Sequence, residues 1–465
     1  MNVMMRNVVM FILVSFIVQA VAQEITVSGK ATGSQGDLIR VLVYADQFSM
    51  LEKSIAETYT DKTGAFALKT SLPKTTFGFL AMNLEKGECY LTPGGNYVFD
   101  IVLPDNVTQG SVFDKIPLQF SLKVENDGGL QSDIEQFNQL YNNFVYENAQ
   151  AIYRSRSKKV IDDFKAKVNS HFDKTSNQYF KDYVHFAFVS LDWLSKRMSD
   201  AKVMEALVLQ PVLYQNIQYT EFFKTYFDNY LELLANKHYD EMVFLLNQSK
   251  TDEGLIHFIQ RDSLLRTNDQ VTELVMMLLM SKFYYVADVQ KTALIQKYKQ
   301  ISSTSQFGPN REIALHFIEK LTQLDYGFPA PEFELINLKG ASVNLQEYRG
   351  KFVLLDFVSS GCQVCVSDLV KLVKIQTRFA DTLDVITLVV NQSGEKASLK
   401  SLDEYGWTFL SVPKTSLLPE QYHVRTFPTY VLINPDGSMA YATMPMPDEN
   451  MELMISRFIA RFSHH

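Results

Sequence analysis

Apolar and polar residues alternate in short runs along the first quarter of the chain, and turn residues separate the runs. Alternation with a period of two is typical of β-strands that bury one face. Asp61-Lys62-Thr63-Gly64 and Pro93-Gly94-Gly95 supply turns between the runs. Short strands with frequent turns predict a β-sandwich over residues 23–125. The expected strands cover residues 25–29, 38–44, 55–59, 65–70, 79–82, 97–103 and 118–124.

From about residue 126 to residue 325 the apolar positions recur every three or four residues, as in Ile134, Phe137 and Leu140. This spacing predicts amphipathic helices with one face toward a core. Prolines, which interrupt helices, are rare in this stretch. Ser132 followed by Glu135 is typical of a capping box that starts the first helix. We expect an all-α region that includes helices over residues 177–196, 221–234 and 270–285.

Residues 326–465 return to alternating strand and helix patterns. The apolar run from Phe352 to Phe357 predicts a buried strand, and helical spacing begins at Cys362 after a Ser-Ser-Gly turn. This order predicts an α/β domain with a mixed sheet and helices on both faces. The expected strands are 352–357, 385–391, 408–412, 429–433 and 439–443, and the expected helices are 362–380, 396–405, 417–423 and 449–462.

Length and charge limit the function. A chain of 465 residues, 46% hydrophobic and 21% charged, is long enough for about three folded domains. The predicted fold class is therefore multi-domain, with an N-terminal β-sandwich, a middle all-α region and a C-terminal α/β domain. The formal net charge of −8 gives no basic surface for nucleic acid, so we exclude nucleic-acid partners.

The first 22 residues have the order of a signal peptide. One positive residue, Arg6, precedes an apolar run over residues 8–18, and Ala20-Val21-Ala22 follows. This order predicts cleavage before Gln23. The apolar run is short for a membrane span, although an uncleaved anchor is the alternative interpretation. We therefore expect the mature protein to be periplasmic or otherwise exported.

Cys362 and Cys365 open the helix that follows the buried strand. At this place unpaired backbone N–H groups and the helix dipole favour a thiolate. The pair can form a disulfide, a dithiol or half of a metal site, and the strand-turn-helix context favours the redox interpretation over a structural disulfide. The third cysteine, Cys89, lies far upstream and is expected to pack as a small hydrophobe in a strand. Because further ligands are lacking, we expect neither a metal nor a cofactor.

The region from Pro329 to the C-terminus resembles the thioredoxin-fold domain of secreted TlpA-like thiol-disulfide oxidoreductases. Residues 23–125 are similar to a small β domain of unknown function that is often fused ahead of bacterial thioredoxin modules. The residues that carry the first resemblance are PAPEFEL from Pro329 to Leu335, Gly350-Lys351, Asp356, Cys362-Gln363-Val364-Cys365, and Phe427-Pro428-Thr429.

This resemblance implies roles for five residues. Cys362 would attack a substrate disulfide, and Cys365 would resolve the mixed disulfide. Asp356 corresponds to the family's buried acid, which would accept the proton of Cys365. Pro428 corresponds to a cis-proline that presents backbone to the bound polypeptide, and Phe427 would shape the substrate groove.

Two positions depart from the family pattern, which has Trp before the first cysteine and Pro before the second. This chain has Gly361 and Val364 there. Both positions shape the groove, so Gly361 joins Phe427 and Pro428 as a substrate-binding position. The implied partners are protein disulfide substrates and a membrane electron donor, and the sequence leaves the oligomeric state open.

Two functions of other classes are weighed against reduction of protein disulfides. One is a non-catalytic interaction protein with a drifted thioredoxin module, which the presence of both cysteines and Asp356 opposes. The other is a thiol peroxidase, whose resemblance to peroxiredoxins would require Thr or Ser three residues and Pro seven residues before the cysteine. Ser359 fits this pattern and Leu355 does not.

Overall fold

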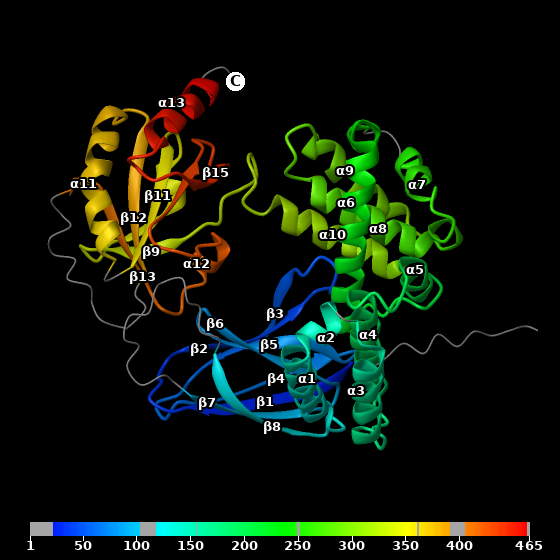
Figure 1. The fold of residues 1–465 in the computed structure, drawn as a ribbon. Coiled ribbons are helices and arrows are strands. Elements are labelled where there is room, and N and C mark those ends of the chain that lie inside the picture. Colours follow the sequence, from blue (N-terminus) through cyan, green and yellow to red (C-terminus); the bar gives the residue numbers. More distant parts are fainter. Residues whose placement is uncertain are drawn as a thin grey trace, which may run out of the picture.

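A computed structural model describes residues 22–102, 118–154, 156–248, 252–359, 362–390 and 405–462 (Figure 1). The expected signal peptide lies outside these ranges except for Ala22, and the expected helix over residues 396–405 lies outside them except for Tyr405. Among the described helices, none has the length and apolar character needed to cross a bilayer.

The N-terminal region forms a β-sandwich, as predicted. Within the described residues it has two four-stranded sheets, with strand orders β4-β1-β7-β8 and β3-β2-β5-β6. Inward-facing residues of both sheets, such as Val27, Val41 and Phe99, share one core. The strands are β1 (Gln23–Ala31), β2 (Leu38–Tyr44), β3 (Glu52–Tyr59), β4 (Ala65–Leu72), β5 (Thr76–Met82), β6 (Glu85–Leu91), β7 (Asn96–Val102) and β8 (Gln119–Glu125).

A strand around Cys89 was expected, but the pattern did not give its bounds, because the first half of β6 is Glu-Lys-Gly-Glu. It pairs with β5 in antiparallel register along its whole length. Cys89 lies in this strand and is 1% exposed, so it packs in the sandwich core as expected.

The middle region is helical, as predicted, and the predicted start of its first helix is wrong. Helix α1 begins at Leu130 with Gly129 as N-cap, three residues before the expected capping box. The carboxylate of Asp127 accepts hydrogen bonds from the N–H groups of Gly129 (2.8 Å) and Gln131 (3.0 Å), so it satisfies the free donors of the first turn.

Ten α-helices run through the described part of this region. The predicted helices at 177–196 and 270–285 agree with α4 and α8 to within a few residues, and α6 is longer than expected, with non-helical backbone at His238. The helices are α1 (Leu130–Glu147), α2 (Ala149–Tyr153), α3 (Lys158–His171), α4 (Gln178–Leu194), α5 (Asp200–Val208), α6 (Ile217–Asn247), α7 (Glu253–Ile259), α8 (Asp269–Phe283), α9 (Lys291–Thr304) and α10 (Gly308–Thr322).

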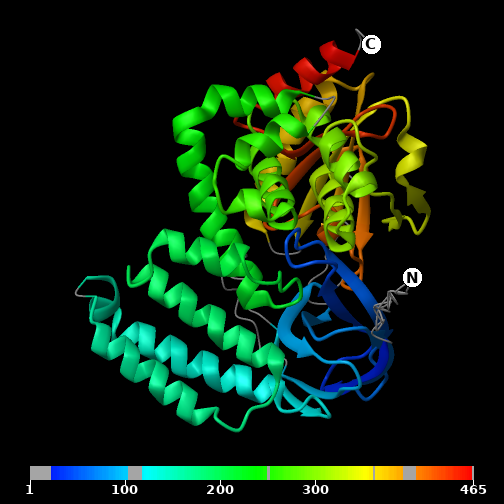
Figure 2. The same cartoon turned by 90° about the vertical axis from the view of Figure 1, so that its right-hand side faces the viewer.

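Residues from the sandwich region also pack in the two hydrophobic cores of the helical region. Phe77 and Tyr90 of the β5–β6 pair pack with Phe137 and Tyr183 of α1 and α4, and the first helices lie against the sandwich in Figure 2. Phe48, from the loop between β2 and β3, packs in the second core, formed by the later helices. Its ring centroid lies 5.3 Å from that of Phe223 on α6.

The C-terminal region is the predicted α/β domain. Its sheet has the strand order β10-β9-β13-β12-β11-β14-β15, with β11, β12 and β13 parallel and β14 antiparallel to β11. Helices α11 and α13 pack on one face and α12 on the other. The elements are β9 (Glu334–Asn337), β10 (Ser342–Asn344), β11 (Phe352–Ser359), α11 (Gln363–Arg378), β12 (Leu383–Val390), β13 (Thr408–Val412), α12 (Leu418–Gln421), β14 (Thr429–Ile433), β15 (Met439–Met444) and α13 (Met451–Phe462).

Candidate redox site

Cys362 and Cys365 lie at the start of α11, directly beyond the buried central strand β11. Cys362 is the N-cap, and its Sγ accepts a hydrogen bond from the backbone N–H of Cys365 at 3.1 Å. This N–H is one of the first donors of the helix, which have no partner within the helix itself. A negative charge on the Cys362 sulfur would therefore be stabilised by the N–H and by the helix dipole.

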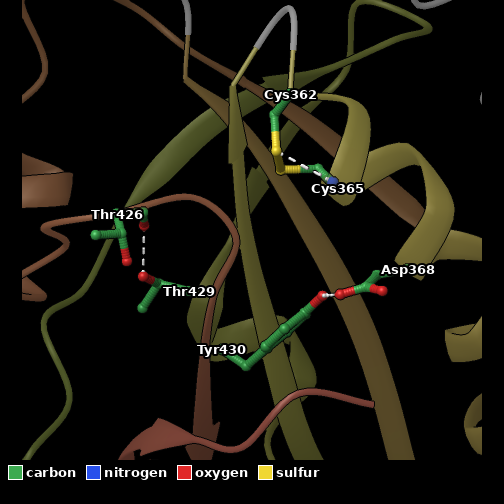
Figure 3. The surroundings of a disulfide bond; sticks show 6 residues. All are labelled: Cys362, Cys365, Asp368, Thr426, Thr429 and Tyr430. Carbon is green, nitrogen blue, oxygen red and sulfur yellow. Dashed lines mark hydrogen bonds between the residues drawn. A yellow bond between two sulfur atoms is a disulfide. The ribbon is translucent and has the colours of Figure 1, made fainter. Parts of the chain in front are cut away.

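The two cysteines form a disulfide, with an S–S distance of 2.07 Å (Figure 3). Their exposures differ, because Cys365 is 2% exposed in the core beneath α11 and Cys362 is only half-buried. An incoming sulfur can therefore reach Cys362 more easily than Cys365.

A turn that ends in a cis-proline lies at the same end of β11. The Phe427–Pro428 peptide bond is cis, and β14 begins at the next residue, Thr429, paired with Phe357 of β11. Thr429 Oγ1 donates a hydrogen bond to the carbonyl of Thr426 at 2.6 Å, which closes the turn. Pro428 is buried and Phe427 is half-buried. The structure thus brings Phe427 and Pro428, two of the predicted substrate-binding positions, to the disulfide's end of the sheet. The third, Gly361, lies outside the described residues.

Asp356 is a buried carboxyl group on β11. It is 1% exposed, and its neighbours at two-residue spacing, Leu354 and Val358, share a core with Cys365. Because side chains two apart on a strand point to the same face, Asp356 points toward the α11 side. Its Oδ2 accepts a hydrogen bond from Thr387 Oγ1 at 3.1 Å, and Trp407 Nε1 donates to the same hydroxyl at 3.0 Å.

Burial raises the pKa of Asp356 to about 7. The hydrogen bond from Thr387 opposes this rise, and the nearby charge of Asp368 adds to it. Its Oδ1 has no hydrogen-bond partner in the described part of the chain. A carboxyl group with this pKa exchanges a proton readily near neutral pH. Asp356 is therefore able to act as an acid or a base beneath the disulfide.

A second buried acid, Asp368, was not singled out from the sequence. It lies three residues after Cys365 on α11 and is 2% exposed. Tyr430 Oη donates to it at 3.0 Å and Lys371 Nζ at 2.7 Å. Tyr430 is also the register partner of Asp356 across β11 and β14. Figure 3 shows the hydroxyl of Tyr430 pointing to Asp368. The available signal was the spacing of three from Cys365, which places an acid on the same side of the helix as the buried sulfur.

Groups of three or more His, Cys, Asp or Glu side chains that could hold a metal ion are absent from the described ranges. The reactive side chains that the structure shows at this site are the two cysteines, Asp356, Asp368 and Tyr430.

The C-terminal region is similar in sequence to thioredoxin-like proteins and thiol-disulfide oxidoreductases. Residues 326–442 match the AhpC/TSA family. The thioredoxin-like protein YneN of Bacillus subtilis is 28% identical over 123 residues, which is 26% of this chain and 72% of that protein. The thiol-disulfide oxidoreductase ResA of Geobacillus kaustophilus is 29% identical over 143 residues, which is 30% of this chain and 82% of that protein.

Among solved structures, the thioredoxin domain of a thiol-disulfide oxidoreductase from Bacteroides vulgatus is 26% identical, with a TM-score of 0.27. The likeness covers 29% of this chain and 98% of that one. Together, the strand order of the C-terminal sheet, the family match and the sequence relatives show that the C-terminal region has a thioredoxin-like fold and is related to thiol-disulfide oxidoreductases.

Proposed function

We propose that this protein is an exported thiol-disulfide oxidoreductase that reduces disulfides in proteins through Cys362 and Cys365. The observation that carries the proposal is the position of this disulfide. It lies at the start of α11 with one sulfur half-exposed and hydrogen-bonded to a free backbone N–H, at the same sheet end as the cis-Pro428 turn. The oxidised pair in the structure stands for the enzyme after one turnover.

In the reduced enzyme, the Cys362 thiolate attacks one sulfur of the substrate disulfide. A new S–S bond joins Cys362 to the substrate, and the second substrate sulfur leaves as a thiolate and takes up a proton. The thiol of Cys365 then loses its proton and attacks the Cys362 sulfur. This step breaks the bond between Cys362 and the substrate, so the substrate sulfur that Cys362 first attacked leaves as a thiolate and takes up a proton. The Cys362–Cys365 disulfide forms, and two electrons have passed to the substrate.

Asp356 supplies the base for the second step in this proposal. Cys365 is buried and lies in the core that Asp356 faces, so its proton has no direct path to bulk water. A carboxyl group with a pKa of about 7 accepts this proton at neutral pH and returns it later. Asp368, which accepts a hydrogen bond from Tyr430, contributes a nearby negative charge that helps to raise the pKa of Asp356.

Each cycle leaves the enzyme oxidised, so a dithiol donor must reduce it again. We propose a membrane protein as this donor, because the N-terminal residues read as a signal peptide and an exported protein lacks the cytoplasmic reductants. The proposed substrates are proteins with accessible disulfides in the same compartment.

The direct test is the reduction of insulin by the reduced full chain, with hydroperoxide consumption measured in parallel. We expect stoichiometric loss of the insulin disulfide and formation of the Cys362–Cys365 disulfide. Rapid oxidation of the enzyme by hydroperoxide but not by insulin would favour a thiol peroxidase. A protein that reacts with neither would be a non-catalytic interaction protein.

The roles of the two cysteines give a second prediction. In the Cys365→Ser variant, the remaining Cys362 should ionise at lower pH than Cys365 does in Cys362→Ser, because only the Cys362 sulfur accepts the free helix N–H. Alkylation rates measured against pH on both variants give the two ionisation curves. A lower titration midpoint for Cys365 would mean that the assigned roles are reversed.

A third prediction concerns the rest of the chain. The redox residues lie between Asp356 and Tyr430, so a fragment that starts at Leu324 should reduce hydroxyethyl disulfide at the rate of the full chain. Circular dichroism and a cooperative thermal transition would show that the fragment is folded. Loss of the activity in a folded fragment would assign a step of the reaction to the sandwich or the helices.

A further inference from the structure

One end of the β-sandwich, where β2 begins, carries two buried, opposite charges. Asp37 and Arg40, at the start of β2, are 2% and 3% exposed. Asn83, in the turn between β5 and β6, holds both. Its Nδ2 donates to Asp37 Oδ1 at 2.9 Å, and its carbonyl accepts from Arg40 Nη2 at 2.8 Å. A buried charge is costly unless it has an oppositely charged partner. The ion-pair partners of Asp37 and Arg40 lie outside the sandwich.

The partners come from the thioredoxin-like domain. Glu420 of α12 accepts two hydrogen bonds from Arg40, at 3.1 and 2.7 Å, in the bidentate geometry that makes such pairs strong. Lys414 pairs with Asp37 at 2.5 Å. Burial would raise the pKa of Asp37, but hydrogen bonds from Lys414, Ser34 and Asn83 outweigh burial and lower it. Each domain therefore contributes one acid and one base to this charged contact.

The charged contact lies at the redox end of the sheet. Lys414 follows the end of β13, and because β11, β12 and β13 are parallel, their final residues share one edge with the start of α11. Strand β13 is two strands from β11, which is about 10 Å at the usual strand spacing. Figure 1 shows the end of β13 and α12 on the side of the domain that faces the sandwich.

Glu420 is also tied to the cis-proline turn. Tyr422, two residues further on, packs its ring 5.4 Å from that of Phe357 on β11 and donates to the carbonyl of Pro331 at 2.6 Å. The chain then runs directly into the turn that ends at Pro428. Because only a few residues separate α12 from Pro428, a shift of α12 would also shift the turn beside the disulfide.

We propose that Arg40 and Asp37 are positioning residues that fix the α12 segment, and through it the cis-Pro428 turn, for polypeptide substrates. This inference rests on the proposed function. A polypeptide must dock on the backbone of the turn before its disulfide is aligned with Cys362, whereas a small disulfide needs only the exposed sulfur. The sandwich thus sets the preference of the site for protein disulfides and carries out no chemical step.

The test uses the full chain with Glu420→Gln, Lys414→Met and both together. The side chains of Glu420 and Lys414 are 42% and 39% exposed, so these variants should fold. We expect kcat/KM for insulin to fall about tenfold in the double variant, mostly through KM, and the rate with hydroxyethyl disulfide to stay within about twofold. The matched control is Lys351→Met, which breaks the partly exposed Lys351–Asp384 pair at the opposite end of β11.

A second measurement tests the pairing itself. Arg40→Lys keeps the charge but not the bidentate geometry and should give an intermediate KM. Adding Arg40→Met to Glu420→Gln should change KM little further, since both remove the same contact. Equal losses with both disulfides, or an unchanged KM for insulin, would overturn the inference and leave the proposed function standing. An unmutated chain that reduces neither disulfide would refute the proposed function and the inference with it.

Discussion

Cys362→Ser is expected to abolish the reduction of protein disulfides, with a fall in rate of at least about 10³-fold. A serine hydroxyl is not ionised near neutral pH and cannot form the S–S bond to the substrate, so neither half of the reaction can proceed. The measurement is the initial rate of insulin reduction by the full chain under a fixed dithiol supply. Residual activity above the rate of the dithiol alone would mean that another group attacks the substrate.

The matched control is Cys89→Ala, which removes the remaining thiol. Burial raises the pKa of Cys89 to about 12, so this thiol stays protonated and shielded in the sandwich core. The control should reduce insulin at the parent rate. A large loss in Cys89→Ala, with the thermal transition unchanged, would bring this cysteine into the redox cycle.

The second large effect is expected for Asp356→Asn, which should slow the release of the mixed disulfide by about 10²- to 10⁴-fold. Asparagine keeps the shape of the side chain and removes the base that accepts the Cys365 proton. Attack by Cys362 should be much less affected, because its thiolate is stabilised by the helix start. In single-turnover experiments the substrate-linked enzyme should accumulate in the variant only. Equal slowing of both steps would reduce Asp356 to a structural residue.

The pH dependence of the free energy of unfolding tests the raised pKa of Asp356 independently of the kinetics. The pKa of Asp356 is about 7 in the folded protein and near 3.8 in the unfolded chain, so the folded state binds the proton more tightly. The stabilisation from this proton is full below about pH 4 and is lost as pH rises through 7. Asp356→Asn should therefore stabilise the protein at pH 8, by a few kcal/mol at most, and much less at pH 5. Equal effects at both pH values would contradict the raised pKa.

Local patterns in the sequence were sufficient to predict elements whose structure depends on residues close together in the chain. The run from Phe352 to Phe357, the turn and the change to helical spacing identify the strand-turn-helix unit that holds the cysteines, because each part depends on nearby residues. Asp356 was identified because the family resemblance places a buried acid at this position of the apolar strand. Asp368 was not, because a single acid in a helix is usually on the solvated face. Its burial depends on Tyr430, which a separate strand supplies.

Contacts between distant parts of the chain could not be predicted in this way. Arg40 and Glu420 are 380 residues apart, and neither has neighbours that mark it as one half of an ion pair. The start of α1 was misplaced for a related reason, since Ser132 and Glu135 fit a local rule but Asp127 supplies the cap from outside the helix. The sequence therefore predicted the cysteine pair at the helix start, and it did not predict the contacts that distant segments supply to it.

The loop that carries Phe48 joins the sandwich to the helices through polar contacts and core packing, so neither part can be replaced without changing the other. Asp46 pairs with His316 at 2.8 Å, Lys224 Nζ donates to the carbonyl of Gln47 at 2.9 Å, and the Phe48 ring fills space among the later helices. Exchanging the sandwich for one from another protein would remove the Phe48 ring and leave a cavity in the core of the helices. This cavity would lower the free energy of unfolding by about 3 to 5 kcal/mol. A chimaera that keeps its fold must therefore carry both parts across together and place its junction beyond α10.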